Sequence, residues 1–130
     1  MNLLDLLHQV MQIKGVTGAA VVNAQGEILE SVMAEELELS YLGNIIATGM
    51  ASSYALAKLL NGGEIVQTVL EYEAGPILLT PLNLNDSAGM RPRNQDAIAV
   101  VTLDSSSSLG RARFKLRKLL PQIAETVALR

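Results

Sequence analysis

Residues 39–60 read LSYLGNIIATGMASSYALAKLL, and this stretch decides how the rest of the chain is organised. Apolar and small residues recur there at steps of three and four, which is the period of an α-helix. The helix is expected to end at Asn61-Gly62-Gly63, because these residues readily adopt the left-handed conformation that terminates helices. One row of side chains predicts the core-facing side of the helix: Leu42, Ile45, Ile46, Gly49, Ser53, Leu56 and Leu60.

The other side of this helix lacks the charge that a solvent-exposed surface normally carries. Lys58 is the only charged residue between positions 39 and 60. Since a small domain cannot cover both sides of the helix, we expect a second molecule to cover one of them. We predict a homodimer whose interface combines this helix with the strand that follows it: Gly43, Ala47, Met50, Tyr54, Val66, Thr68 and Leu70. A set of small, uncharged residues is predicted to bind a further protein: Asn44, Thr48, Ala51, Ser52 and Ala55.

A membrane span is an alternative for the same stretch, because residues 39–57 carry no charge and are nearly long enough to cross a bilayer. Polar side chains such as Asn44 and Thr48 would then lie at membrane depth. The residues before the helix (Glu35, Glu36 and Glu38) are acidic, whereas membrane spans are usually flanked by basic residues. We therefore expect no direct insertion into a membrane.

The composition of the 130 residues predicts one domain, 1–130, with an aliphatic core. Apolar residues make up 49% of the chain and aromatic residues 3%. The absence of cysteine excludes disulfides and thiolate metal sites. A net charge of −3 gives no general attraction for nucleic acid or for anionic membranes, so we expect no nucleic-acid partner. The N-terminal residues lack the basic leader of a signal peptide, and a cytoplasmic location is expected.

Patterns on either side of the central helix predict the remaining elements. The turn at 23–26 has the asparagine and glycine of a hairpin. The segment 83–95 is expected to be a polar loop at the surface. Alternatively, this loop contacts a partner. The expected helices and strands are a helix at 2–14, strands at 16–22, 27–33, 64–73, 77–82 and 97–103, and a last helix that opens after the serines 105–108.

The last helix has two unusual features. Pro121 lacks the N–H that would bond the carbonyl of Arg117, so a kink or break is predicted there. The outward side of the helix carries half of the chain's ten basic residues: Arg111, Arg113, Lys115, Arg117 and Lys118. This patch is either an ordinary solvated helix face or a contact for an acidic partner.

Catalytic machinery is missing from the sequence. It contains no phosphate-binding GxxxxGK[ST] loop and no GxSxG nucleophile motif. Its one histidine, His8, falls on the polar side of the first helix, with no nucleophile nearby. We therefore expect a protein that is not an enzyme, with no catalytic residues, no bound metal and no cofactor.

Four stretches taken together resemble the Roadblock (dynein light chain) family in its short prokaryotic form. They are GVTGAAVVNAQGEIL at 15–29, the small-residue helix that ends KLLNGG at 58–63, PILLTPL at 76–82, and LGRARF at 109–114. The resemblance implies an α+β, three-layer sandwich in the order α-β-β-α-β-β-β-α. A five-stranded antiparallel sheet would lie between the long central helix and the two terminal helices.

The resemblance also implies a function. Members of the family form homodimers or heterodimers and serve as platforms or regulators for small Ras-like GTPases, without catalytic residues of their own. The further partner expected at Asn44, Thr48, Ala51, Ser52 and Ala55 is thus a Ras-like GTPase. Two other functions stay open at this point, a small-ligand sensor and a membrane-associated assembly subunit. The low aromatic content disfavours the sensor, because ligand pockets usually have aromatic walls.

Overall fold

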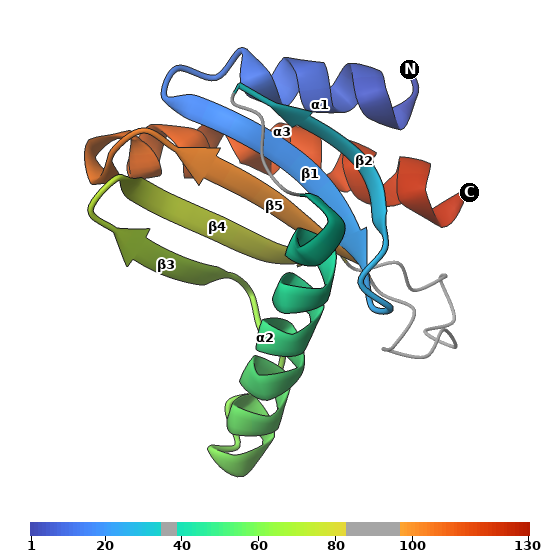
Figure 1. Ribbon diagram of the computed structural model, residues 1–130, viewed down its shortest axis with the longest axis vertical. Coiled ribbons are helices and arrows are strands. Elements are labelled where there is room, and N and C mark those ends of the chain that lie inside the picture. The colour runs from blue at the N-terminus through green and yellow to red at the C-terminus, as the bar shows by residue number, and fades with distance from the viewer. Residues whose placement is uncertain (35–38, 83–96) are drawn as a thin grey trace.

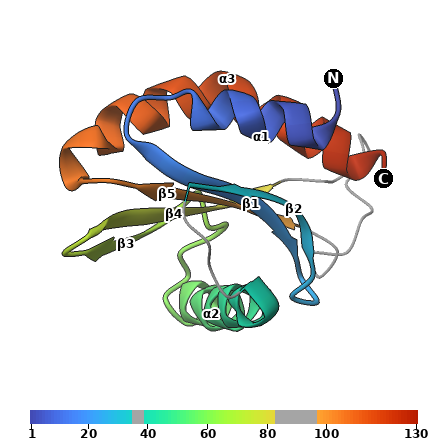
Figure 2. The same cartoon turned by 45° about the horizontal axis from the view of Figure 1, so that its top comes forward.

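The computed structural model describes residues 1–34, 39–82 and 97–130, which form three layers (Figure 1). Helix α2 (Leu39–Leu59) lies on one face of a sheet, and α1 (Leu3–Met11) and α3 (Leu109–Ala128) lie side by side on the other face (Figure 2). A short 3₁₀ turn, η2 (Ser106–Ser108), leads into α3. The predicted α+β class, element order and layer arrangement are confirmed.

The sheet contains five antiparallel strands in the spatial order β2-β1-β5-β4-β3. The central strands β1 and β5 are covered on both faces, which explains why their sequences are almost continuously apolar. The edges are formed by β2 and β3, so both edge strands adjoin α2 in the chain. The strands are β1 (Val16–Asn23), β2 (Ile28–Met33), β3 (Thr68–Tyr72), β4 (Gly75–Leu82) and β5 (Ala97–Leu103).

Local side-chain signals fix the first helix and the first hairpin as predicted. The Oδ1 of Asn2 accepts the N–H of Asp5 at 2.8 Å, and the Asp5 carboxylate accepts the N–H of Asn2 at 3.3 Å, which is a capping box. In the β1–β2 turn, the Oδ1 of Asn23 accepts the N–H groups of Gln25 and Glu27. Gly26 completes this turn with a φ of 85°, a conformation that costs glycine little.

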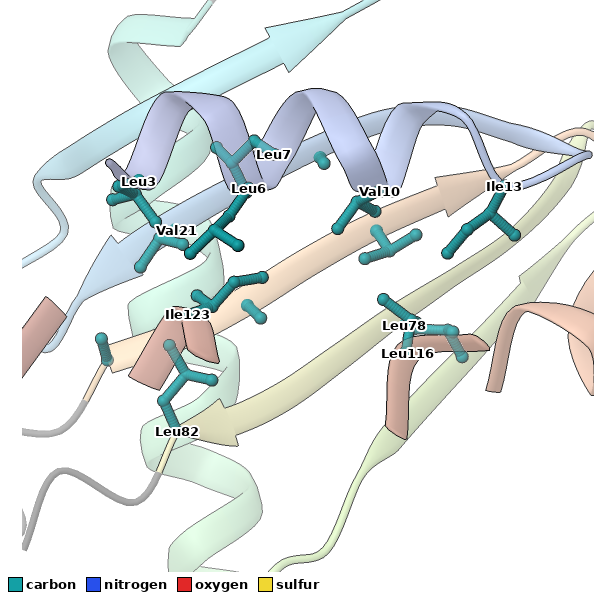
Figure 3. Close-up of a cluster of buried hydrophobic side chains, with 14 of the residues drawn as sticks. Leu3, Leu6, Leu7, Val10, Ile13, Val21, Leu78, Leu82, Leu116 and Ile123 are labelled. Atoms are coloured by element: carbon teal, nitrogen blue, oxygen red, sulfur yellow. The ribbon is translucent and has the colours of Figure 1, made fainter. Parts of the chain in front are cut away.

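The sheet separates two apolar clusters. The larger one lies beneath α1 and α3, where leucines and isoleucines of both helices meet Val21, Leu78 and Leu82 (Figure 3). The smaller one lies between the sheet and α2 and includes Ala20, Val22, Ile46, Met50, Leu79, Ile98 and Val100. None of the buried side chains in the described ranges is polar or charged. Burial of aliphatic surface on both faces of the sheet therefore holds the layers together.

Two predictions about individual elements are wrong. Strand β3 begins at Thr68 and not at 64, because the Gln67 side chain turns to donate to the Oγ1 of Thr80 and to accept from the Nε of Arg113. Helix α3 is not broken at Pro121 but runs without interruption to Ala128. Pro121 is exposed, and α3 arches over the sheet in Figure 2. A curved helix lengthens its solvent-side hydrogen bonds, so the missing N–H is tolerated there. The predicted loop 83–95 and the acidic Glu35, Glu36 and Glu38 lie outside the described residues.

Candidate interaction surface

A close approach between Gly43 and Gly26 sets the rotation of α2 against the sheet. A Cβ built at Gly43 would collide with the carbonyl oxygen of Gly26. The residues of α2 that become buried follow from this contact, since Ile46 and Met50 lie one and two turns further along the same side. Ile46 retains 6% of its accessible surface and Met50 retains 1%. Only the first half of this 21-residue helix is therefore anchored to the sheet by buried residues.

The opposite side of α2 exposes an apolar stripe made of Tyr41, Ile45, Leu56 and Leu59, which we call the α2 stripe. The exposed fractions of these side chains are 66%, 67%, 55% and 79%. Their spacing of four, eleven and three residues keeps them on one side of the helix over about five turns. In Figure 1 the second half of α2 extends past the strands, so the sheet lies beneath only the first half of the helix.

Beside the stripe lies the small-residue face, which consists of Asn44, Thr48, Ala51, Ser52 and Ala55. All five residues are exposed, as the sequence predicts for a partner-binding surface. Ser52 lies within the α2 stripe, one turn before Leu56, and Thr48 lies at its border, whereas Asn44, Ala51 and Ala55 lie further round the helix. Their role in binding a partner stays a prediction.

Strand β3 adds a free sheet edge on the same side of the molecule. It is the last strand of the described sheet, and it pairs with β4 on its inner side. Leu70 stands opposite Ile77, which belongs to the cluster under α2, so Leu70 and Tyr72 face the α2 side of the sheet. These two side chains are 42% and 61% exposed. The exposed apolar side chains of β3 therefore lie on the same face of the sheet as α2, next to an open strand edge.

The part of the sheet that α2 leaves uncovered contains an open groove of about 540 Å³. Apolar side chains such as Met33, Tyr72 and Ile77 line it. Its polar members are Thr17, Thr102 and Asp104. The hydroxyl oxygens of Thr17 and Thr102 hydrogen-bond each other at 2.8 Å, and the Oδ1 of Asp104 accepts from the Oγ of Ser108 at 2.8 Å. Because the two threonine hydroxyl groups satisfy each other's hydrogen bonding across the bulge between Val16 and Gly18, they offer a small ligand little to recognise.

The structure corrects the predicted interface in part. Gly43 and Met50 face the chain's own sheet, so the prediction that they meet a partner is wrong. Ala47 and Tyr54 are half-buried, and Tyr54 packs against the cluster under α2. Val66 and Leu70 are exposed and Thr68 is half-buried. An interface role for Val66, Thr68 and Leu70 stays a prediction.

The predicted core row of α2 is confirmed for Ile46, which is buried, and for Leu42, which packs against the cluster under α2. The centre of the buried side is nevertheless rotated from that row by roughly the step of one residue around the helix, about 100°. Ile45 and Leu56, which the sequence predicts in the core, belong to the exposed α2 stripe. The sequence contains two apolar rows on α2, and hydrophobicity alone does not decide which one meets the sheet. Gly43 is the residue that decides it, but its contact with Gly26 exists only in the folded chain.

Two other kinds of site find no support in the described residues. No three His, Asp or Glu side chains in these ranges gather closely enough to hold a metal ion. Across the same ranges, no helix combines the length and the apolar character needed to cross a membrane.

Comparison with known proteins identifies the fold. Residues 3–85 match the Roadblock/LC7 domain. An MglB structure described as having a tetrameric arrangement is 20% identical, with a TM-score of 0.74, over 96% of this chain and 89% of that chain. MglB of Myxococcus xanthus is 17% identical with a TM-score of 0.80, over 95% and 92%. A Roadblock/LC7 domain from Streptomyces avermitilis is 14% identical with a TM-score of 0.64, over 98% and 95%. No curated protein matches the sequence.

Proposed function

This chain belongs to the Roadblock/LC7 domain family, and from that premise we propose that it is a cytoplasmic, non-enzymatic, dimeric scaffold that binds a small Ras-like GTPase. The bound GTPase would be regulated in its activity or held at a location. We further propose that residues 1–130 act as one Roadblock domain. The family match ends at residue 85, but β5 lies at the centre of the sheet and α3 completes the core.

The observation that carries the proposal is the uncovered α2 stripe. Four large apolar side chains more than half exposed on one helix side are costly to leave in water, and contiguous apolar patches of this kind mark interaction sites. A second copy of the chain offers the same stripe, and such self-complementary contacts are the commonest way to form a two-fold dimer. A stable dimer of standard size covers on the order of 800 Å² on each subunit.

Strand β3 gives the proposed dimer its register. Pairing of the free β3 edge with the same edge of a second copy would continue the sheet across the two-fold axis. Both α2 helices would then lie on one side of the joined sheets, next to each other across the two-fold axis. The tetrameric arrangement described for one MglB structure supports self-association as a property of this fold.

The small-residue face is the proposed GTPase surface. Its side chains allow another backbone to come close, lose little side-chain entropy on ordering, and leave few polar groups unpaired on burial. In the proposed dimer the two small-residue faces border the paired α2 helices, so a GTPase could contact both copies. Since the chain has no phosphate-binding loop, any change in hydrolysis rate would arise from ordering the partner's own catalytic segments.

The substitution Ala51→Glu tests this function. Ala51 is exposed and lies off the α2 stripe, so the variant should fold and keep the dimer mass in light scattering while losing the GTPase. The readout is affinity capture from the native host, followed by a GTP-hydrolysis assay on the eluted protein. Ala34→Glu, an exposed alanine after β2, is the matched control and should retain the GTPase. If Ala51→Glu captures as much GTPase as the control, the small-residue face is not the docking surface.

A further inference from the structure

The charged residues of α3 are distributed in the opposite way to the one that its helix dipole favours. Arg111, Arg113, Lys115, Arg117 and Lys118 all lie in its first half, and its only acidic residue, Glu125, lies near its end. The first turn contains no acid and the last turn no base. Cations near a helix N-terminus and like charges four residues apart both lower helix stability. This arrangement does not help α3 to fold, which points to a use in binding an anionic partner.

Four of these five cations are free to meet such a partner. Arg113 is held by its Nε, which donates to the Oε1 of Gln67 at 2.7 Å. Arg111, Lys115, Arg117 and Lys118 are exposed, and their side chains form no hydrogen bond or ion pair with any other described residue. The N-terminal end of α1, with its acidic Asp5, lies beside the opposite end of α3 in both views of the chain. The basic half of α3 is therefore well separated from the acid on α1.

An aromatic side chain stands among these cations. Phe114 is 66% exposed, and it lies one helical turn from Arg111, Arg117 and Lys118. These residues are exposed, whereas Ala112 and Leu116 of the same turns are buried, so they lie on the side of α3 that faces away from the core. We call Arg111, Phe114, Lys115, Arg117 and Lys118 the α3 patch. It presents one protruding apolar ring within a cluster of positive charges on a convex surface.

We propose that the α3 patch binds the surface of anionic phospholipid membranes peripherally. Clusters of four or more Lys and Arg residues on a helix are suited to anionic headgroups. The long aliphatic stems of these side chains allow cations on the flanks of the helix to reach a surface that its outer side contacts. Phe114 can enter the boundary between headgroups and acyl chains, as aromatic and leucine side chains of interfacial helices do. Nucleic acid is disfavoured, because a single ring gives no series of stacking platforms.

The α3 patch lies on the face of the sheet opposite to α2. The proposed dimer would therefore leave the α3 patch of each subunit free and present both patches on the same side. This bivalence depends on the proposed dimer, but the patch itself does not. The two proposals are separable, because a monomeric variant should still bind anionic vesicles, although more weakly.

Vesicle co-sedimentation of the full chain tests the proposal. The protein should bind vesicles that contain phosphatidylglycerol, should not bind vesicles of phosphatidylcholine alone, and should be released by salt. Each cation near an anionic surface contributes about fivefold in affinity, so Arg117→Gln with Lys118→Gln should weaken binding about 25-fold. Lys14→Gln with Lys58→Gln makes the same change in net charge at sites outside the patch and should weaken binding much less.

Two further measurements keep the test decisive. Phe114→Ser should weaken vesicle binding at high salt as well as at low salt, because it removes an apolar contribution. Circular dichroism should show all patch variants folded, since each changed residue is exposed. The proposal is overturned if the two double variants bind equally, if neutral vesicles bind as well as anionic ones, or if no vesicle binds. It is also overturned if a DNA duplex binds in place of vesicles and the patch variants abolish that binding.

Discussion

Gly43 shows how one missing side chain can orient a whole helix. Its neighbour across the contact is the backbone of Gly26, in a turn that the Asn23 side chain already holds in place. Neither partner can move away easily, because the turn is hydrogen-bonded and α2 is fixed by Ile46 and Met50. The exposure of the α2 stripe is thus a consequence of where two glycines meet.

Replacing Gly43 with alanine should destabilise the fold, because the new Cβ would collide with the Gly26 carbonyl oxygen. Overpacking of this kind typically costs about 1–3 kcal/mol. Gly110→Ala is the control, since nothing lies within 4 Å of a Cβ built at Gly110 and alanine favours a helix over glycine. Urea unfolding should show a lower midpoint for Gly43→Ala and an unchanged or higher midpoint for Gly110→Ala. An unchanged midpoint for Gly43→Ala would mean that α2 is not held by this contact.

At the scale of single elements, Pro121 in α3 is the clearest departure from local rules. The proline cannot donate to the carbonyl of Arg117, yet the helix continues for seven residues beyond it. The Nε2 of Gln122 donates to the carbonyl oxygen of Lys118 at 3.0 Å, which is not the carbonyl of Arg117 that the proline leaves without its helical donor. Buried side chains on both sides of the proline, Leu116 and Ile123, keep the two halves of α3 on the sheet.

Pro121→Ala should therefore raise the melting temperature or leave it unchanged. Alanine restores the missing backbone hydrogen bond, and the full penalty of an interior proline is about 3 kcal/mol. Differential scanning calorimetry measures the effect. A clear loss of stability in Pro121→Ala would show that the curve of α3 depends on the proline.

Elements with local signals could be predicted from the sequence, whereas those decided by tertiary contacts could not. The turn at Asn23 and the strands β1 and β5 carry their own instructions, and each is confirmed. The start of β3 depends on Gln67 reaching Thr80 and Arg113, which are distant in sequence. The rotation of α2 depends on Gly26 in the same way. For this reason the sequence predicts which helix carries the candidate surface but not which of its sides is exposed.

At the scale of the whole molecule, the sheet divides two kinds of surface. The α2 side exposes apolar side chains and a free strand edge, which suit a second copy of the chain. The opposite side carries the α1–α3 layer, where α3 supplies the polar, basic outer surface. Self-association through the first side would leave the second accessible. This division allows one small domain to dimerise and to contact other partners at the same time.

If the α2 stripe is covered by a second copy, the thermal stability of the protein must depend on its concentration. Dimerisation stabilises the folded state by mass action, so each tenfold rise in concentration should raise the melting temperature by about 2–4 °C for a dimer of this size. Leu56→Glu should abolish this dependence, because it places a charge in the middle of the proposed interface. Leu129→Glu changes an equally apolar, 82% exposed side chain at the end of α3 and should preserve the dependence. Light scattering on the same samples supplies the masses. A melting temperature that does not vary with concentration in the unmodified chain, together with a monomer mass, would show that the stripe meets a different protein.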